Sequence, residues 1–403
     1  MHDPAGFFAP YDAAKCATCG QCLAACPVLT IDADEGRAMI ATLRDGGRVA
    51  KLERGCQTCF ACNFACPNGA NPAQLIRARF AERMEQDGPR RWSAYFQQQR
   101  PDNFRAAAAD ALPAEDRELL DSWRDETPVE KILYPGCNLC NTAWLARTRL
   151  LDGYDIRGGF HVCCGEPFYR TGMDDHLRRT ARNLDRWLDA LGVKHMTVAC
   201  TAGTCLFRYV LPRYGLQHEM EVRPLLEDLF DDFSAGRRPV ERSLGLRVTV
   251  QESCYGKILG PAYMAKVRAL LTMIGCTVVE MQHSHERSLC CGIGAGFAPD
   301  VGYHPLVMTA GAARVLREAG RVKADRLVSY CSGCLLTLTG MGQLYPGHVG
   351  VSHLLALLAE ATGETLPDRI SAVSRAMLAG ALKRQFPRLL DFGRVKMPPP
   401  PLT

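Results

Sequence analysis

Eight cysteines near the start of the chain fall in two runs of identical form, Cys-x-x-Cys-x-x-Cys-x-x-x-Cys-Pro. They are Cys16, Cys19, Cys22 and Cys26 in the first run, and Cys56, Cys59, Cys62 and Cys66 in the second. This is the spacing of bacterial ferredoxins that hold four-iron clusters. Two residues between thiolates let the backbone curl around one corner of a cube, and the proline, which lacks an N–H, ends the curl. A zinc ribbon or a disulfide scaffold fits less well, because zinc sites use cysteine pairs at long separation.

The two runs therefore predict two cubane [4Fe-4S] clusters. In two-cluster ferredoxins the fourth cysteine of each run serves the other cluster. We accordingly expect one cluster at Cys16, Cys19, Cys22 and Cys66, and the other at Cys56, Cys59, Cys62 and Cys26. Between the runs, residues 36–52 have a helical pattern with Met39, Ile40 and Leu43 on one face. That pattern favours an interleaved helical ferredoxin domain over a compact β-type one.

Five further thiols lie in the last third of the chain. They are Cys254, the adjacent Cys290 and Cys291 before Gly292, and Cys331 and Cys334. Two β-type runs, 246–251 and 327–330, precede them, and ligands of open α/β sheets gather at the carboxyl ends of strands. Adjacent cysteines are poorly placed to bind one tetrahedral iron, but they can bind two neighbouring irons. The pattern indicates a multinuclear iron–sulfur site; buried structural thiols are the alternative.

A similar order of elements occurs earlier in the chain, which indicates a duplication. Strands predicted at 131–134 and 196–199 alternate with helical patterns, which favours a parallel sheet flanked by helices. The thiols here are Cys137, Cys163, Cys164, Cys200 and Cys205, with Cys140 as an extra. Cys205 takes the place of the last cysteine, and Ala202 stands where another is expected. Either Cys200 or Cys140 could complete a site, or this half could hold a different cluster or none.

The duplicated arrangement Cys…Cys-Cys-Gly…Cys-x-x-Cys resembles the CCG-domain proteins. These include components of heterodisulfide reductase, the K subunit of the sulfite-reduction membrane complex, and iron–sulfur subunits of glycolate oxidase and anaerobic glycerol-3-phosphate dehydrogenase. A double ferredoxin motif joined to two CCG domains is most similar to the D subunit of heterodisulfide reductase. The resemblance implies a non-cubane [4Fe-4S] cluster in the complete motif, with a second possible in the first half. By position its ligands, which would also be the catalytic residues, are Cys254, Cys290, Cys291, Cys331 and Cys334.

Two functions follow from the resemblance. In the first, the chain is a catalytic oxidoreductase subunit that reduces a disulfide or related sulfur substrate. Its electrons would come from a membrane b-type cytochrome or quinone-reactive subunit, as in anaerobic respiration, or from a soluble donor. In the second, it relays electrons from a flavoprotein dehydrogenase subunit to quinone. The glycines at 292, 294 and 296 lack the dinucleotide-binding form, so flavin or nicotinamide chemistry is expected on a partner.

Composition narrows the cellular setting. The chain has twenty cysteines among 403 residues, mostly in clusters, and residues 1–10 do not have the pattern of a signal peptide. Clustered cysteines in a protein that is not exported indicate metal binding. No apolar run reaches the roughly 18–20 residues that span a bilayer. A net charge of +5 without a Lys/Arg stripe does not suggest nucleic-acid binding. We therefore expect a cytoplasmic protein, held at the inner face of the membrane through a partner.

The expected organisation is an α-helical double-cluster ferredoxin domain followed by two duplicated α/β CCG domains. The boundaries are 1–90 for the ferredoxin domain, 91–127 for a helical linker, 128–240 and 241–365 for the two halves, and 366–403 for a basic amphipathic tail. Residues 370–392 have helical spacing with basic residues largely off the apolar face. This tail could pack on its own domain, or dock on a membrane partner or the anionic leaflet.

A few side chains near the cysteines are candidates for supporting roles. His161, His283, His285 and His304 could donate a proton to a leaving thiolate. Lys257 follows Cys254 and could stabilise anionic thiolates, whereas Cys276 is expected to be structural.

Overall fold

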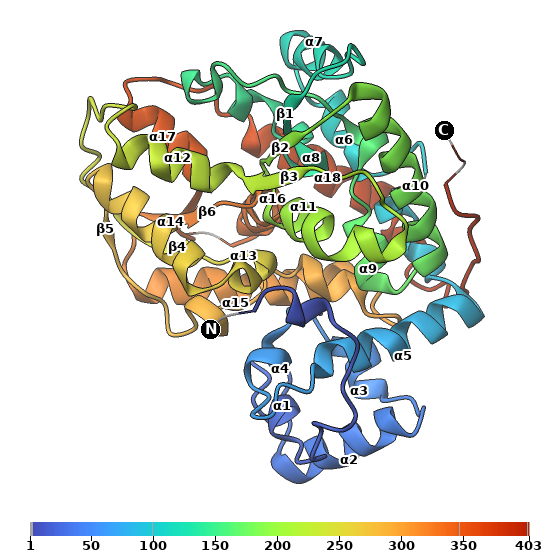
Figure 1. The fold of residues 1–403 in the computed structure, drawn as a ribbon. Coiled ribbons are helices and arrows are strands. Elements are labelled where there is room, and N and C mark those ends of the chain that lie inside the picture. Colours follow the sequence, from blue (N-terminus) through green and yellow to red (C-terminus); the bar gives the residue numbers. More distant parts are fainter. Residues whose placement is uncertain (1–2, 99, 346, 401, 403) are drawn as a thin grey trace.

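A computed structural model describes residues 3–98, 100–345, 347–400 and 402. A small helical lobe, blue in Figure 1, lies below a larger body that contains both sheets. The lobe comprises α1 (Gln21–Ala24), α2 (Ala33–Arg44), α3 (Ala50–Gly55), α4 (Ala61–Phe64) and α5 (Pro72–Asp87). The ferredoxin-type cysteine runs lie in the lobe, and all the later cysteines lie in the body.

Helix α2 forms because its start is capped and its apolar residues share one face. The Asp32 side chain accepts a hydrogen bond from the Glu35 amide at 2.8 Å. Met39, Ile40 and Leu43 are buried, as predicted, in a cluster that includes residues of α5. The single helix predicted over 36–52 is wrong in extent, because the chain turns between α2 and α3 with Gly46 at φ 81°.

The segment predicted to be a helical linker is only partly helical. It contains a 3₁₀ helix at Arg91–Phe96, then α6 (Phe104–Asp110) and α7 (Ala114–Ser122). Its aromatic residues are buried, and the Trp92 indole donates to the Val301 carbonyl at 2.9 Å. The Tyr95 hydroxyl donates to the Met377 carbonyl at 3.0 Å. The segment is thus packed into the body and is not a spacer. The linker prediction was made from the polar composition of the segment and did not consider its aromatic residues.

Two parallel sheets form the body. The first has the order β1 (Lys131–Tyr134), β2 (His195–Val198), β3 (Glu221–Pro224). The second has the order β5 (Thr277–Val278), β4 (Arg247–Gln251), β6 (Arg326–Ser329), β7 (Gly350–His353). The prediction of parallel strands flanked by helices is confirmed, and four of the seven strands within the described residues lie within one residue of the expected ranges.

Helices connect and cover these strands. In the first half they are α8 (Gly136–Cys140), α9 (Glu166–Thr171), α10 (Asp174–Leu191), α11 (Thr201–Cys205) and α12 (Leu225–Ser234). In the second half they are α13 (Cys254–Leu259), α14 (Pro261–Met273), α15 (Pro305–Arg321), α16 (Ser332–Gly342) and α17 (Leu354–Ala361). Single-turn helices lie at Gly6–Phe8, Ala143–Ala146, Arg149–Leu151, Phe160–Val162, Leu211–Tyr214, His285–Arg287, Ile293–Phe297 and Phe386–Arg388, and a π-helix at Leu206–Val210.

The two sheets correspond strand by strand. β1, β2 and β3 match β4, β6 and β7 in order and direction. Beside β1 the first half has only an isolated parallel bridge between Leu133 and Ile156, at the place where β5 pairs with β4. This correspondence fixes which residues of the two halves are equivalent.

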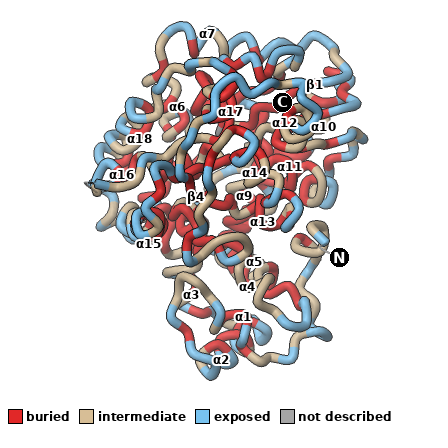
Figure 2. The backbone as a smooth tube through the Cα atoms, turned by 90° about the vertical axis from the view of Figure 1, so that its left-hand side faces the viewer, coloured by how far each residue is buried: buried red, intermediate tan, exposed pale blue. Residues whose placement is uncertain are grey.

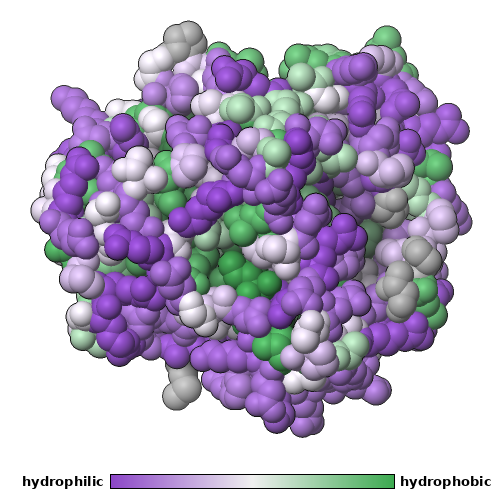
Figure 3. Space-filling view, turned by 90° about the horizontal axis from the view of Figure 1, so that it is seen from above, coloured by the Kyte–Doolittle hydropathy of each residue, from purple (hydrophilic) through white to green (hydrophobic). Residues whose placement is uncertain are grey.

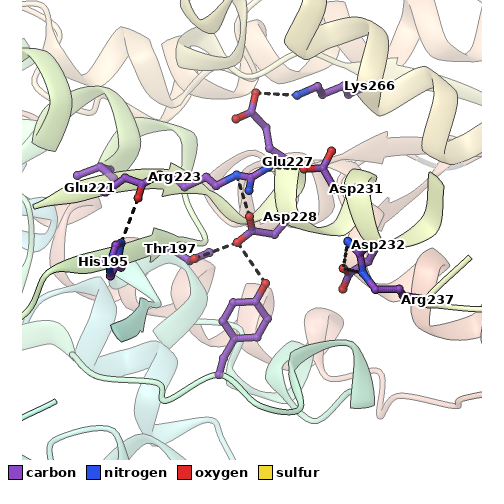
Figure 4. A network of polar contacts seen from close by, with 12 residues as sticks. His195, Thr197, Glu221, Arg223, Glu227, Asp228, Asp231, Asp232, Arg237 and Lys266 are labelled. Carbon is purple, nitrogen blue, oxygen red and sulfur yellow. Dashed lines mark hydrogen bonds and ion pairs between the residues drawn. The ribbon is translucent and has the colours of Figure 1, made fainter. Parts of the chain in front are cut away.

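Both halves contribute to one interior. A single buried cluster includes Leu133 and Trp144 of the first half with Val250 and Leu271 of the second. Figure 2 shows the buried backbone concentrated in the body, with a smaller buried centre in the lobe. In a polar network on β2, β3 and α12, the Asp228 carboxylate accepts from Thr197 and pairs with Arg223 (Figure 4). Beside it, Lys266 of α14 in the second half donates to Glu227 of the first half at 3.0 Å. The halves are therefore held as one body.

The C-terminal tail also packs on the body. Helix α18 (Ile370–Arg384) contacts α6 and α16, and its Val373 is fully buried. The single helix predicted over 370–392 ends early, and α18 packs on its own protein, which is one of the two alternatives that the sequence left open for the tail. Beyond it, Leu390 is 85% exposed and Phe392 is 67% exposed. The face in Figure 3 is largely hydrophilic, with a hydrophobic patch near its centre.

Asp300 joins the tail to the rest of the molecule. Its carboxylate accepts from Arg90 at 2.6 Å and from Arg394 at 2.5 Å, and its amide donates to the Glu53 carbonyl of α3. Burial opposes ionisation, but the two guanidinium groups outweigh it and lower the pKa of Asp300. A lowered folded-state pKa stabilises the fold above the ordinary carboxyl pKa, and this stabilisation is lost as the pH falls through the folded value.

We expect Asp300→Asn to cost about 2 kcal/mol, because it leaves two partly buried guanidinium groups without their shared carboxylate. The Val395 amide, which donates to the Pro89 carbonyl at 3.0 Å, should then exchange hydrogen faster. Asp391→Asn is the matched control, since its pair with Arg91 is longer, at 3.5 Å, and solvent-exposed. Equal exchange at Val395 in both variants would contradict this role for Asp300.

Candidate functional site

The two cysteine runs of the lobe have the same backbone path. Thr18 and Thr58, each two residues after the first cysteine of its run, have φ values of 54° and 47°. Gly20 and Phe60, each four residues after, are also left-handed, at 76° and 63°. Such a path turns the chain tightly so that successive thiols face one space. A Cβ at Gly20 would lie 2.2 Å from the Arg37 amide nitrogen, so only glycine fits there.

The eight thiols form two groups, and the fourth cysteine of each run lies with the other run. Cys22 lies beside Cys16, Cys19 and Cys66, which we call the first ferredoxin group. Cys62 lies beside Cys26, Cys56 and Cys59, which we call the second ferredoxin group. Cys62 also lies near Cys22, so the two groups are neighbours. This is the crossed grouping expected from the spacing.

The surroundings of these thiols suit bound iron. Burial raises the pKa of Cys22 and of Cys56 to about 12, so these thiols ionise only with a cation beside them. Backbone amides donate at 3.3 Å to the sulfurs of Cys26, Cys56 and Cys66. A cavity of about 50 Å³ is lined by all four cysteines of the second ferredoxin group. Four thiolates with amide donors are the donor set of a four-iron cluster.

The five cysteines of the second half also come together, at the carboxyl ends of β4 and β6. The contacts form a continuous series from Cys254 to Cys290, Cys291, Cys334 and Cys331. Hydrogen bonds from the neighbouring thiols lower the pKa of Cys291 to about 5. Among the described residues, no three His, Cys, Asp or Glu side chains are placed to hold a single metal ion. We call these thiols the five-cysteine set.

Gly292 fixes the adjacent pair in this set. Its φ is 103°, and a Cβ there would lie 2.3 Å from the Met308 carbonyl oxygen. Gly292 therefore lies tight against α15, where only glycine fits.

In the first half the structure corrects the equivalences predicted from the sequence. Cys200 immediately precedes α11 with φ −119° and ψ 127°, and Cys331 immediately precedes α16 with φ −131° and ψ 117°. Both follow the equivalent strands β2 and β6 by two residues, so Cys200 is the counterpart of Cys331. Gly203 then takes the place of Cys334, and neither Ala202 nor Cys205 is the equivalent position. The missing fifth cysteine is thus at 203.

Cys205 and Cys140 neighbour this group, next to Cys200 and Cys163 respectively, but both are buried in the apolar core. Cys205 is fully buried in apolar core, with its thiol 3.9 Å from the Tyr255 carbonyl oxygen. Cys140 lies within reach of Cys163 but is fully buried in the shared core. The remaining thiols form a four-cysteine set of Cys137, Cys163, Cys164 and Cys200.

The two sets face each other across one central cavity of about 100 Å³. Its lining includes Cys137, Cys164, Cys200, Cys254, Cys291, Cys331 and Cys334. Thr201 and Ser253, which both line this cavity, join the halves through a hydroxyl contact of 2.7 Å, and Thr142 and Ser332 join them through a second contact of 3.1 Å. Thiols from both halves therefore share one space.

A larger outer cavity of about 510 Å³ reaches Cys163 from the first half. Arg105 of α6 lines both cavities, and its guanidinium donates to the Cys163 sulfur at 3.3 Å. Arg105 is buried, so it places a cation against the four-cysteine set. Sequence reasoning missed it, because it lies in a segment that was predicted to be a linker.

The side chains that were predicted to support the cysteine sites differ in where the structure places them. Lys257 is fully buried beside Cys254, and its ammonium donates to the Ser288 carbonyl at 3.1 Å. His161 lines the outer cavity, whereas His283 pairs with Glu318 at 2.6 Å. His304 stacks edge-on against Trp92. His283, His285 and His304 are not among the residues that line the central cavity, so the structure gives them no position for proton donation there. Cys276 is buried apart from these sets, as predicted.

The fold and the thiol sets define an iron–sulfur protein of the CCG-domain class. The family of 4Fe-4S dicluster domains matches residues 9–67, and the family of cysteine-rich CCG domains matches residues 145–208 and 248–339. The chain belongs to the CCG-domain iron–sulfur proteins of electron transport, and the relatives that it matches are subunits of oxidoreductases.

Three relatives illustrate the class. The D subunit of dihydromethanophenazine:CoB–CoM heterodisulfide reductase from Methanosarcina barkeri is 26% identical over 328 residues, 77% of this chain and 78% of that protein. The B subunit of fumarate reductase (CoM/CoB) from Methanothermobacter marburgensis is 26% identical over 51% of this chain and 39% of its own length. The C subunit of anaerobic glycerol-3-phosphate dehydrogenase from Escherichia coli is 27% identical over 43% of each chain. This chain thus matches less than half of the last two.

Proposed function

We propose that the chain carries electrons from the first ferredoxin group through the second to the five-cysteine set, where a disulfide or related sulfur substrate is reduced. The observation that carries this proposal is the serial arrangement of the three thiol groups. Cys22 of the first group lies near Cys62 of the second. Cys59 of the second group is buried in the same apolar cluster as Cys290, Cys291 and Cys334. The series begins in the lobe and ends at the central cavity.

Each ferredoxin group would hold a cubane [4Fe-4S] cluster, and the five-cysteine set a non-cubane one. When bound, these clusters supply electrons singly, whereas a disulfide takes up two. The chain's own contribution is placement and charge. The central cavity brings thiols of both halves together, Lys257 sets a buried cation beside Cys254, and Arg105 sets another beside Cys163. These cations would stabilise the thiolates that a substrate releases on reduction.

A second function is favoured by one observation, the glycine at 203 in place of a fifth cysteine. With one complete set only, the chain could relay electrons between a flavin dehydrogenase subunit and quinone without cleaving a substrate. Turnover of disulfides by the isolated, reduced chain would separate the two, because a relay requires its partner. The facing thiols in the central cavity favour the catalytic alternative.

The partner on the donor side is proposed to be a b-type cytochrome or quinone-reactive membrane subunit, or a flavoprotein. No helix within the described residues is long and apolar enough to cross a membrane. We propose that the chain attaches to the membrane through that partner. The exposed Leu390 and Phe392 of the tail are candidates for the contact.

Iron counting and EPR on anaerobically isolated protein test this proposal. About eight irons per chain would mean the ferredoxin clusters alone, about twelve one further cluster, and about sixteen two. We expect about twelve or more, and Cys290→Ser should remove about four together with the unusual EPR signal. The ferredoxin signals should persist, and the control Cys276→Ser should change nothing. An iron count of about eight per chain in both the wild type and Cys290→Ser would contradict the proposed catalytic site.

A further inference from the structure

We propose that Arg170 of α9 couples the second ferredoxin group to the five-cysteine set. The inference rests on the proposed function, since it takes both thiol groups to hold clusters. Arg170 belongs to neither group: it comes from the first half, six residues after Cys164. Its role is that of a positioning residue, which holds two cluster loops together and places one fixed positive charge between them.

Toward the lobe, Arg170 binds the loop between Cys56 and Cys59. Its Nη2 donates to the Gln57 carbonyl at 3.0 Å and to the Thr58 carbonyl at 2.8 Å. The same Nη2 and the Nε donate to the Thr58 hydroxyl, at 2.7 and 3.0 Å. Thr58 is one of the left-handed residues that shape this loop. The guanidinium fork therefore fixes the loop through its backbone, which a lysine could do only in part.

Toward the body, the same guanidinium lies against the five-cysteine set. It stacks 4.4 Å from the centre of the Phe297 ring and is an electrostatic neighbour of Cys254 and Cys290. The Thr58 hydroxyl continues the contact by donating to the Gly294 carbonyl at 3.2 Å. Gly294 marks the meeting point: a Cβ there would lie 2.3 Å from the Gln57 carbonyl oxygen, 2.8 Å from the Cys290 sulfur and 2.9 Å from Arg170 Nη2.

The charge of Arg170 acts in a dry environment. Its side chain is 5% exposed, and its carboxylate partner is Glu166 at 3.2 Å. Arginine stays protonated at any ordinary pH, so its charge is constant. A buried cation lowers the energy of the more negative, reduced state of a nearby cluster and thereby raises its reduction potential. Removal of the charge should lower the potential, whereas removal of the fork alone should slow transfer.

The experiment compares Arg170→Gln and Arg170→Lys in the full-length, anaerobically prepared protein. EPR potentiometry gives the potential of each cluster, and freeze-quench EPR after mixing with reduced viologen gives the rate at which the five-cysteine signal is reduced. Arg170→Gln should lower the reduced-to-oxidised ratio of that signal about tenfold at fixed poise, which is about 59 mV for a one-electron couple. It should also slow reduction at least tenfold. Arg170→Lys should restore the potential but not the rate.

Arg178→Gln serves as control, because Arg178 lies on the neighbouring α10, is half exposed and pairs with Asp175, three residues before it. Arg170→Gln with full iron, unchanged potential and unchanged rate would overturn the inference and leave the proposed function intact. Wild-type protein without the five-cysteine signal would instead overturn the proposed function. If Arg170→Gln loses iron, the isosteric Thr58→Val decides: slower reduction at unchanged potential supports the coupling, and an unchanged rate contradicts it.

Discussion

Gly294→Ala should cost about 3 kcal/mol of stability and greatly slow electron transfer from the lobe to the five-cysteine set. The added methyl would lie 2.3 Å from a backbone carbonyl oxygen of the lobe, closer than carbon and oxygen approach without bonding. Its other two neighbours are the Cys290 sulfur and the Arg170 guanidinium, both held by several contacts. None of the three is a free side-chain end, so the lobe and the body must move apart.

Thermal unfolding and the freeze-quench reduction rate measure the two effects in the same anaerobic preparation. Gly320→Ala is the matched control, because Gly320 lies on α15 and a Cβ added there would meet no atom within 4 Å. In a helix that change is neutral or slightly stabilising. A Gly294→Ala protein with the stability and transfer rate of the control would show that the lobe does not sit against the Gly292–Gly296 stretch.

Cys26→Ser should abolish reduction of the five-cysteine set, and Cys66→Ser should leave it possible, although each variant loses about four irons. The reason is the crossed grouping. Cys26 is in the first run but lies with Cys56, Cys59 and Cys62, beside the body. Cys66 is in the second run but lies with the first ferredoxin group, farther along the series. The first substitution therefore removes the cluster next to the five-cysteine set, and the second removes the outer one.

Iron counts confirm that one cluster is lost in each variant, and freeze-quench EPR with reduced viologen then follows the five-cysteine signal. The two variants control for each other, since both replace the cysteine before a proline. The reverse result, with reduction retained in Cys26→Ser and lost in Cys66→Ser, would mean that each run holds its own cluster.

The sequence was a good guide wherever spacing alone carries the geometry. The ferredoxin runs, the parallel strands and the five-cysteine set follow from short motifs and period-two runs. The match of Cys205 to the last cysteine failed, because it was judged from cysteine spacing, whereas equivalence depends on where β2 ends. The segment after Cys200 also continues into a π-helix, and irregular turns of this kind leave no sequence signal.

Arg105 and Arg170 could not have been found in this way. Each acts on cysteines far away in the chain: Arg105 donates to Cys163, and Arg170 binds the loop at Thr58. Such contacts exist only after the lobe, the segment after it and both halves have packed together. A single sequence gives no indication of which of its many arginines will be buried beside sulfur.

Both copies line the central cavity, and the hydroxyl contacts Thr201–Ser253 and Thr142–Ser332 hold the two copies together. Either copy expressed by itself would present its strand ends to solvent, with half of the wall missing. The two copies are thus not independent modules, although the first has Gly203 where the second has Cys334. The residues of the first copy that face the second can therefore change only in ways that keep the two surfaces complementary.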